Sequence, residues 1–199
     1  MKIGIMGGTF DPIHNAHIIT ARFAAEQYGI DRMMFMTSGN PPHKSGITDK
    51  HIRNRMTELG VDGEFEVNTY ETDKADYSYT LHTLRHFKET NPNDDIYFII
   101  GEDSLKDIGK WHKPQEILKL CTLLVFPRTS LKSLNELIKQ TEITLDGEIL
   151  PVDSPVMELS STMIRRRIKD GKSVKHMIPD KVLEYIEENG LYKKETVYE

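Results

Sequence analysis

The chain of 199 residues contains one cysteine and one tryptophan, has more acidic than basic residues, and lacks a long apolar run. The single thiol, Cys121, excludes an internal disulfide and the paired thiolates of a structural zinc site. A formal net charge of −5 argues against a nucleic-acid partner, because such binding depends on concentrated Lys and Arg. No segment has the length and apolarity of a membrane span or a signal peptide, so we expect a cytoplasmic protein.

The order of predicted elements indicates the fold class. Hydrophobic periodicity and turn residues predict strands at 2–6, 32–37, 65–70, 96–100 and 122–126, and helices at 15–28, 49–60, 79–90, 111–120, 131–140, 160–169 and 180–189. Alternating strands and helices with short connections predict an α/β fold, a Rossmann-like doubly wound parallel sheet with helices on both faces and a helical C-terminal part. No repeat or linker divides the chain, so we expect one domain over 1–199.

The segment between the first predicted strand and helix carries the strongest chemical signal. It reads Gly7-Gly8-Thr9-Phe10-Asp11-Pro12-Ile13-His14-Asn15-Ala16-His17. Glycines let a backbone approach a phosphate, a helix start offers free N–H groups, and His14 and His17 share one helical face. The alternative is a surface pair of histidines or half of a metal site, but no companion cluster of ligands accompanies them. Because open α/β sheets bind ligands at the carboxyl ends of their strands, the segment predicts a triphosphate site.

A second candidate anion site lies near the other end of the chain, in Glu158-Leu159-Ser160-Ser161-Thr162-Met163-Ile164-Arg165. Ser160 is a natural helix N-cap, the next two hydroxyls accompany free N–H groups, and Arg165 follows one turn later. Alone, this pattern is typical of a capped helix with a solvent-facing basic run. Two predicted phosphate-binding helix starts in one chain favour an anion site.

These two segments resemble the first and second motifs of the HxGH nucleotidylyltransferase superfamily. Three middle segments are similar to the nicotinate mononucleotide adenylyltransferases, namely Pro41-Pro42-His43-Lys44, Ser78-Tyr79-Thr80, and Gly101-Glu102-Asp103-Ser104-Leu105 with the following Trp111. With the tail at 178–192, the resemblance spans nearly the whole chain. The chain departs from the pattern at Ala16, where the superfamily usually has Gly, and at Glu102, where we expect a smaller residue.

The resemblance implies a nucleotidyltransferase that transfers AMP from ATP to nicotinic acid mononucleotide, giving nicotinic acid adenine dinucleotide and pyrophosphate. It implies catalytic roles for His14, His17 and Arg165. The implied ATP-binding residues are Gly7, Gly8, Thr9, Phe10, His17, Gly101, Asp103, Ser160, Ser161, Thr162 and Arg165. The implied mononucleotide-binding residues are His43, Lys44, Ser78, Tyr79, Thr80 and Trp111. We expect Mg²⁺ as a cofactor carried mainly by ATP, with no metal site built by the protein alone.

Other functions stay open at this point. A pantetheine-phosphate adenylyltransferase shares both end motifs, although Trp111 and the segment at 78–80 argue against it. A nucleotide-binding regulator without turnover is a second alternative, which the presence of both histidines and Arg165 disfavours. A dinucleotide-dependent oxidoreductase lacks its Gly-x-Gly-x-x-Gly fingerprint. The sequence also leaves a homo-oligomer open.

Overall fold

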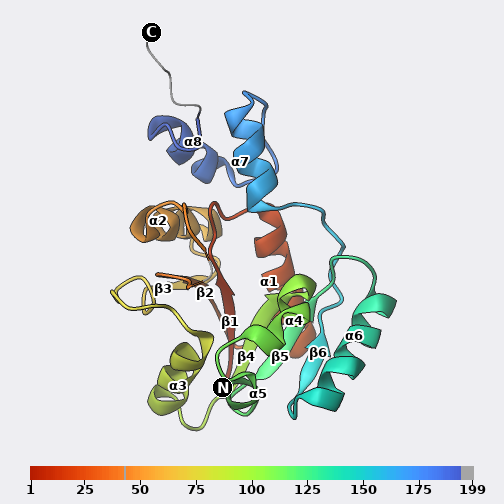
Figure 1. Ribbon diagram of the computed structural model, residues 1–199. Coiled ribbons are helices and arrows are strands. Elements are labelled where there is room, and N and C mark those ends of the chain that lie inside the picture. Colours follow the sequence, from red (N-terminus) through yellow and green to blue (C-terminus); the bar gives the residue numbers. More distant parts are fainter. Residues whose placement is uncertain (43, 194–199) are drawn as a thin grey trace.

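The computed structural model describes residues 1–42 and 44–193, and in these ranges six parallel strands form one sheet in the order β3-β2-β1-β4-β5-β6 (Figure 1). The strands are β1 (Lys2–Gly8), β2 (Arg32–Thr37), β3 (Glu66–Asn68), β4 (Asp95–Gly101), β5 (Thr122–Phe126) and β6 (Ile149–Pro151). The order reverses between β1 and β4, which is where sheets of this kind open a ligand crevice. The predicted doubly wound α/β fold is confirmed.

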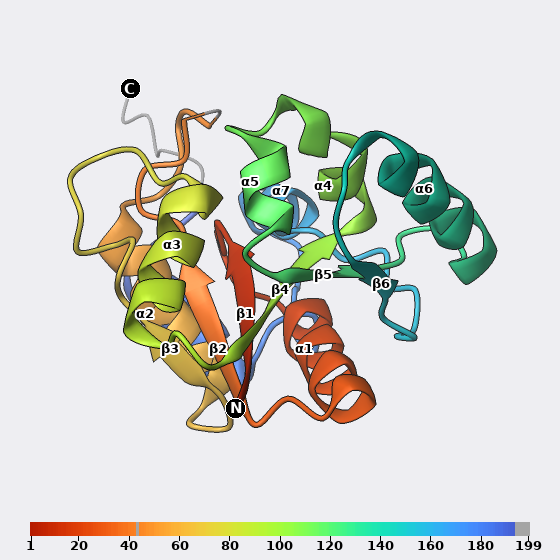
Figure 2. The same cartoon turned by 90° about the horizontal axis from the view of Figure 1, so that it is seen from below.

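Helices cover both faces of the sheet (Figures 1 and 2). One face packs against α3 (Thr80–Thr90), α4 (Glu102–Lys106), the 3₁₀ helix η1 (Ile108–Lys110), α5 (Pro114–Leu118) and α6 (Leu131–Thr144). The other packs against α1 (Asn15–Tyr28), α2 (Lys50–Val61), α7 (Ser161–Lys169) and α8 (Asp180–Glu188). In β1, Ile3 and Ile5 face the first layer and Met6 the second. Among the described residues, no helix combines the length and the apolar composition that a membrane span requires.

The predicted end of the first strand is wrong. We expected the strand to stop at Met6, with Gly7 and Gly8 forming a turn, but β1 continues through Gly8. Neither glycine has a positive φ. Gly8 is needed for a different reason, because a Cβ at this position would lie 2.6 Å from the ring of Phe10. The close approach of that ring shapes the loop that follows β1.

Short elements account for the other differences. The structure adds α4, η1 and β6, shortens the predicted strand at 65–70 to β3 and the predicted helix at 111–120 to α5, and extends α6 to Thr144. The strand β6 has three residues, ends in Pro151 and pairs only with β5 in the described sheet. Such a strand at a sheet edge carries no alternating pattern that a sequence could reveal.

Candidate active site

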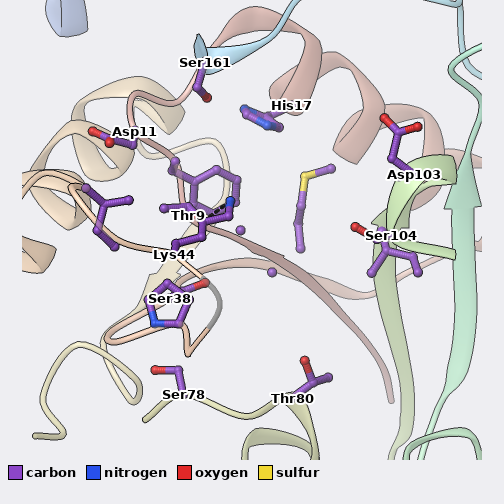
Figure 3. A pocket seen from close by; sticks show the side chains of 18 of the residues that line it. Thr9, Asp11, His17, Ser38, Lys44, Ser78, Thr80, Asp103, Ser104 and Ser161 are labelled. Atoms are coloured by element: carbon purple, nitrogen blue, oxygen red, sulfur yellow. Dashed lines mark hydrogen bonds between the residues drawn. The ribbon is translucent and has the colours of Figure 1, made fainter. Parts of the chain in front are cut away.

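A cavity of about 770 Å³ opens at the carboxyl ends of β1, β2, β4 and β5. The residues predicted for ATP or mononucleotide binding all line it, except His43, which lies outside the described residues. The predicted catalytic residues His14, His17 and Arg165 line it too. Figure 3 shows Ser78 and Thr80 at one end of this cavity and His17 and Ser161 at the other. The sequence therefore located the residues of one shared site, while their individual roles stay predictions.

The two motif segments meet at one end of the cavity, although they lie far apart in the chain. The Ser161 hydroxyl donates to the carbonyl of Pro12 over 2.8 Å, across 149 residues of sequence. Arg165 donates from Nη1 to the carbonyl of Asp11 over 2.6 Å. As predicted, Ser160 is the N-cap of α7, and its hydroxyl accepts from the N–H of Met163 at 3.2 Å. Within the described residues, the N–H groups of Ser161 and Thr162 have no protein partner and remain available to an anion.

The two histidines form a stacked pair, with ring centroids 3.6 Å apart and planes 16° from parallel. The backbone N–H of His14 donates to Nδ1 of His17 over 3.2 Å. An imidazole nitrogen that accepts a hydrogen bond carries no proton, so neutral His17 holds its proton on Nε2. The ring of Phe10 supports His17 edge-on, with the centroids 5.0 Å apart. The fold thus fixes both the orientation and the tautomer of His17, which becomes an N–H donor through Nε2.

Both imidazoles are neutral at pH 7. Burial, reinforced by the positive charge of Arg128, lowers the pKa of His14 from 6.5 to about 4. Burial also lowers the pKa of His17 well below 6.5, helped by His14, Arg128 and Lys44. Two neutral donors fit a site whose positive charge comes from nearby Lys and Arg side chains.

The depressed pKa of His14 predicts how stability depends on pH. The unfolded chain protonates this side chain near pH 6.5 and the folded chain only near pH 4, so acid favours unfolding between these values. At pH 5 the expected loss of unfolding free energy is about 2 kcal/mol from His14 alone. Urea unfolding at pH 7 and pH 5 measures it. His14→Gln should lose less stability between the two pH values than the wild type, and equal losses would show that His14 is not the group responsible.

Positive charge gathers at the end of the cavity formed by Thr9 and Arg165. The ammonium group of Lys44 donates to the Thr9 hydroxyl over 2.7 Å (Figure 3). Burial lowers the pKa of Lys44, and the charges of Arg165 and Arg53 lower it further, while Asp11 opposes them. An anion that enters here meets several cations whose mutual repulsion it relieves.

The other end of the cavity is built differently from what the sequence suggested. The Ser78 hydroxyl accepts from the N–H groups of Gly39 and Asn40 at 3.0 and 3.1 Å. The buried Glu71 carboxylate lies close enough for the Ser78 hydroxyl to lower its pKa, against the larger effect of burial, which raises it. Ser78 therefore lines the cavity, but its hydroxyl already holds the backbone of the loop at Gly39 and Asn40. Beside it, α3 begins at Thr80 with no acidic residue in its first turn, and Trp111 is half-buried against the core.

Arg128 is a site residue that sequence reasoning missed. It follows β5, lines the cavity and donates from Nη1 to the carbonyl of Leu159 over 3.0 Å. Glu102 holds its backbone, since the Glu102 carboxylate accepts from the N–H groups of Arg128 and Thr129 at 2.8 and 3.1 Å. Burial raises the pKa of Glu102, but these bonds and Lys106 outweigh it and keep the pKa below its ordinary value. The sequence contained one signal that could have identified Arg128 as a site residue, namely its position just after the carboxyl end of the predicted strand at 122–126.

Arg53 is a second missed residue, and it lies under the cavity rather than in its lining. Its side chain is 1% exposed. The guanidinium donates to four main-chain carbonyls, those of Thr48, Thr9, Ser38 and Gly39, over 2.7 to 2.8 Å. One buried cation thereby joins the loop after β1 to both ends of the loop between β2 and α2.

Carboxylates are sparse in this site. No group of three His, Cys, Asp or Glu side chains suited to a metal ion occurs in the part of the chain that the structure describes. Asp11, Asp103 and Glu71 line the cavity as separate carboxylates, and Glu71 lies beside Ser78 at the far end. This donor set fits Mg²⁺ held largely by substrate phosphates and water, with at most one or two carboxylates.

Comparison with known proteins identifies the family. The cytidylyltransferase-like family model matches residues 5–167. The "Probable nicotinate-nucleotide adenylyltransferase" of Clostridium botulinum (strain Loch Maree) is 43% identical over 196 residues, which cover 95% of this chain and 98% of that protein. The chain belongs to this adenylyltransferase family. The relative of the same name in Clostridium tetani is 41% identical, with 96% and 99% of the two chains covered.

Solved structures of the family share the fold. The Plasmodium falciparum nicotinic acid mononucleotide adenylyltransferase complexed with NaAD has a TM-score of 0.76 at 20% identity, covering 96% of this chain and 97% of that one. The same enzyme complexed with APC has a TM-score of 0.73 at 19% identity, with 96% of each chain covered. At this level of identity the likeness concerns the arrangement of the sheet and helices.

Proposed function

We propose that this chain transfers the AMP part of ATP to nicotinic acid mononucleotide, forming nicotinic acid adenine dinucleotide and pyrophosphate. The observation that carries the proposal is the meeting of both motif segments at one cavity, where Ser161 bonds to Pro12 and Arg165 to Asp11. Relatives at 41% and 43% identity over nearly the whole chain bear the name of this activity, and a solved structure of the same fold is a complex with NaAD. The reaction belongs to NAD biosynthesis.

The cavity accommodates two substrates end to end. ATP lies at the end formed by the loop after β1 and the start of α7, with its phosphates near His17, Ser161 and Arg165. The mononucleotide lies at the end formed by the 38–48 loop and the start of α3, with Lys44 near its phosphate. Trp111 stacks on the pyridine ring. This arrangement of the two substrates is supported by the fact that all these residues line the cavity.

The reaction needs no protein nucleophile, since the phosphate of the mononucleotide is itself an anion that attacks the α-phosphorus. A new oxygen–phosphorus bond forms while the bond to the bridging oxygen breaks, and pyrophosphate leaves. The enzyme aligns two anions and offsets the charge that grows on the leaving oxygens. Nε2–H of His17, the N–H groups at the start of α7 and the guanidinium of Arg165 serve that purpose. His14 supports the ring of His17 and adds a second neutral imidazole.

A magnesium ion belongs to this proposal as a companion of ATP. When bound, it offsets phosphate charge as a Lewis acid. Asp11 and Asp103, the carboxylates that line the cavity near the predicted ATP phosphates, are the residues suited to approach it. The remaining work of orienting the substrates and excluding water falls to the protein.

One assay tests the assignment of the acceptor. Purified protein with ATP and Mg²⁺ should release pyrophosphate when nicotinic acid mononucleotide is added, and phosphopantetheine should give no release above background. Chromatography of the dinucleotide product confirms the acceptor. If phosphopantetheine supports pyrophosphate release and nicotinic acid mononucleotide does not, the chain is instead a pantetheine-phosphate adenylyltransferase. Release with neither acceptor would favour the nucleotide-binding regulator.

Two expectations from the sequence stay predictions, namely the cytoplasmic location and the lack of a nucleic-acid partner. Both follow from composition and charge. Whether the chain forms a homo-oligomer stays open.

A further inference from the structure

Tyr192 reaches the active site from the far end of the chain. It follows α8 and lies 181 residues beyond Asp11, yet its hydroxyl donates to Oδ1 of the Asp11 carboxylate over 2.6 Å. Asp11 is 3% exposed and lines the cavity. The segment after α8 therefore contacts the loop in which we place the ATP phosphates.

The Asp11 carboxylate has weaker partners besides Tyr192. Its Oδ2 accepts from the N–H of Thr48 at 3.3 Å and lies 3.8 Å from Nη1 of Arg165. That nitrogen donates instead to the main-chain carbonyl of Asp11 over 2.6 Å. A carboxylate and a guanidinium gain from closer, bidentate contact. The orientation of the Asp11 carboxylate thus decides how many N–H donors of the Arg165 guanidinium remain available to an anion in the cavity.

Several contacts fix the position of the Tyr192 hydroxyl. The residue has a φ of 63°, a left-handed conformation that bulky side chains rarely adopt. Its ring packs into the core layer of α2 and α8, with the hydroxyl 3.8 Å from Sδ of Met56. Burial and the Asp11 carboxylate raise the pKa of Tyr192 above its ordinary value, so the phenol stays protonated and donates.

We propose that Tyr192 is a positioning residue, whose hydroxyl holds the Asp11 carboxylate in place and so leaves the Arg165 guanidinium free for a substrate phosphate. The inference rests on the proposed function, in which Arg165 binds ATP. Without the hydroxyl, the strongest remaining partner of Asp11 is Arg165, and the two side chains close into an ion pair. The guanidinium then turns away from the cavity.

Tyr192→Phe tests this role, because it keeps the ring and removes only the hydroxyl. Calorimetric titration with ATP, in the absence of acceptor, should show a Kd raised about tenfold, as expected for a lost hydrogen bond to a charged group. The KM for ATP should rise in parallel, while the KM for the mononucleotide stays near the wild-type value. A wild-type Kd for ATP in this variant would overturn the proposal.

Tyr28→Phe is the matched control. Tyr28 ends α1, is half-buried like Tyr192, and its hydroxyl donates to the carbonyl of Pro151 over 2.5 Å, away from the residues that line the cavity. This variant loses a donated hydrogen bond of comparable length, together with one accepted from Gln27, and should bind ATP as the wild type does. If both variants lower Tm and raise the Kd for ATP equally, Tyr192 has only a structural role.

A double-mutant cycle with Asp11→Asn completes the test. The neutral amide no longer attracts Arg165, so adding Tyr192→Phe to Asp11→Asn should leave the Kd for ATP almost unchanged. An equal loss from Tyr192→Phe in both backgrounds would show that the hydroxyl acts without Asp11, and would overturn the proposal. ATP binding is measured without the acceptor. A protein that binds ATP but forms no dinucleotide would therefore refute the proposed function while the cycle still decides the role of Tyr192.

Discussion

Replacing His17 by alanine is expected to lower kcat by about 10²–10³, the typical effect of removing one donor that faces developing negative charge. The structure explains why the donor is already oriented. Nδ1 of His17 accepts from the backbone of His14, which leaves the proton on Nε2, and the stacked ring of His14 restricts rotation. Because the pKa of His17 is lowered by burial, the neutral form carries out this role throughout the neutral pH range. Steady-state kinetics with both substrates near saturation measure the effect.

Two further variants separate the donor from the fold. Glutamine places an N–H close to the position of Nε2, so His17→Gln should retain more activity than His17→Ala. His51→Ala removes an exposed imidazole from the start of α2, outside the cavity lining, and should leave kcat unchanged. Circular dichroism and Tm confirm that each variant is folded. A folded His17→Ala with a kcat near that of the wild type would show that Nε2 does not stabilise the transition state.

The parts of the site that sequence reasoning placed correctly depend on local chemistry. A serine before a helix caps it, as Ser160 does, and the residues after a buried strand lie at the carboxyl edge of a parallel sheet. The segments after β1 and before α7 were therefore recognisable one by one. Their meeting through Ser161 and Pro12 followed from both being predicted to bind phosphate.

Residues whose role depends on tertiary contacts were not predictable. Arg53 looks like any cation on a predicted helix, yet four carbonyls from separate loops bury it. Glu102 departs from the family pattern, and only the pairing of β4 with β5 brings its carboxylate to the backbone of Arg128. Ser78 was expected at the pyridine carboxylate, but its hydroxyl accepts from the N–H groups of Gly39 and Asn40. A hydrogen-bonding side chain reveals its partners only once the loops are folded.

The engagement of Ser78 changes the reasoning on substrate choice. The Ser78 hydroxyl already accepts two backbone bonds and lies near the Glu71 carboxylate, whose pKa it lowers, so a ligand would compete with Glu71 for its single proton. We therefore expect Thr80 to recognise the pyridine substituent, through its hydroxyl and through the N–H groups at the start of α3. In the described structure, the N–H groups of Thr80 and Leu81 have no protein partner. Glu71 also lines the cavity, but its carboxylate is already engaged by the hydroxyl of Thr83, which donates to it over 2.6 Å.

We therefore expect kcat/KM for nicotinic acid mononucleotide to exceed that for its amide counterpart by tens to thousands of fold. A carboxylate accepts bonds from two donors, whereas a carboxamide turns one acceptor into an NH₂ group that faces a donor. The mismatch leaves both the protein donor and the NH₂ group unpaired. Each unpaired buried donor costs about 1–3 kcal/mol, and the two together correspond to a ratio of about tens to thousands. Trp111 contributes little, because stacking treats the two rings almost alike.

The measurement uses both mononucleotides at the same ATP and Mg²⁺ concentrations, with two variants at residue 80. Thr80→Val should bring the acid-to-amide ratio closer to one, while Thr80→Ser, which keeps the hydroxyl, should retain it. A wild-type ratio near one would refute acid selectivity but leave adenylyl transfer intact, and a high ratio that Thr80→Val does not change would assign recognition to the backbone N–H groups alone.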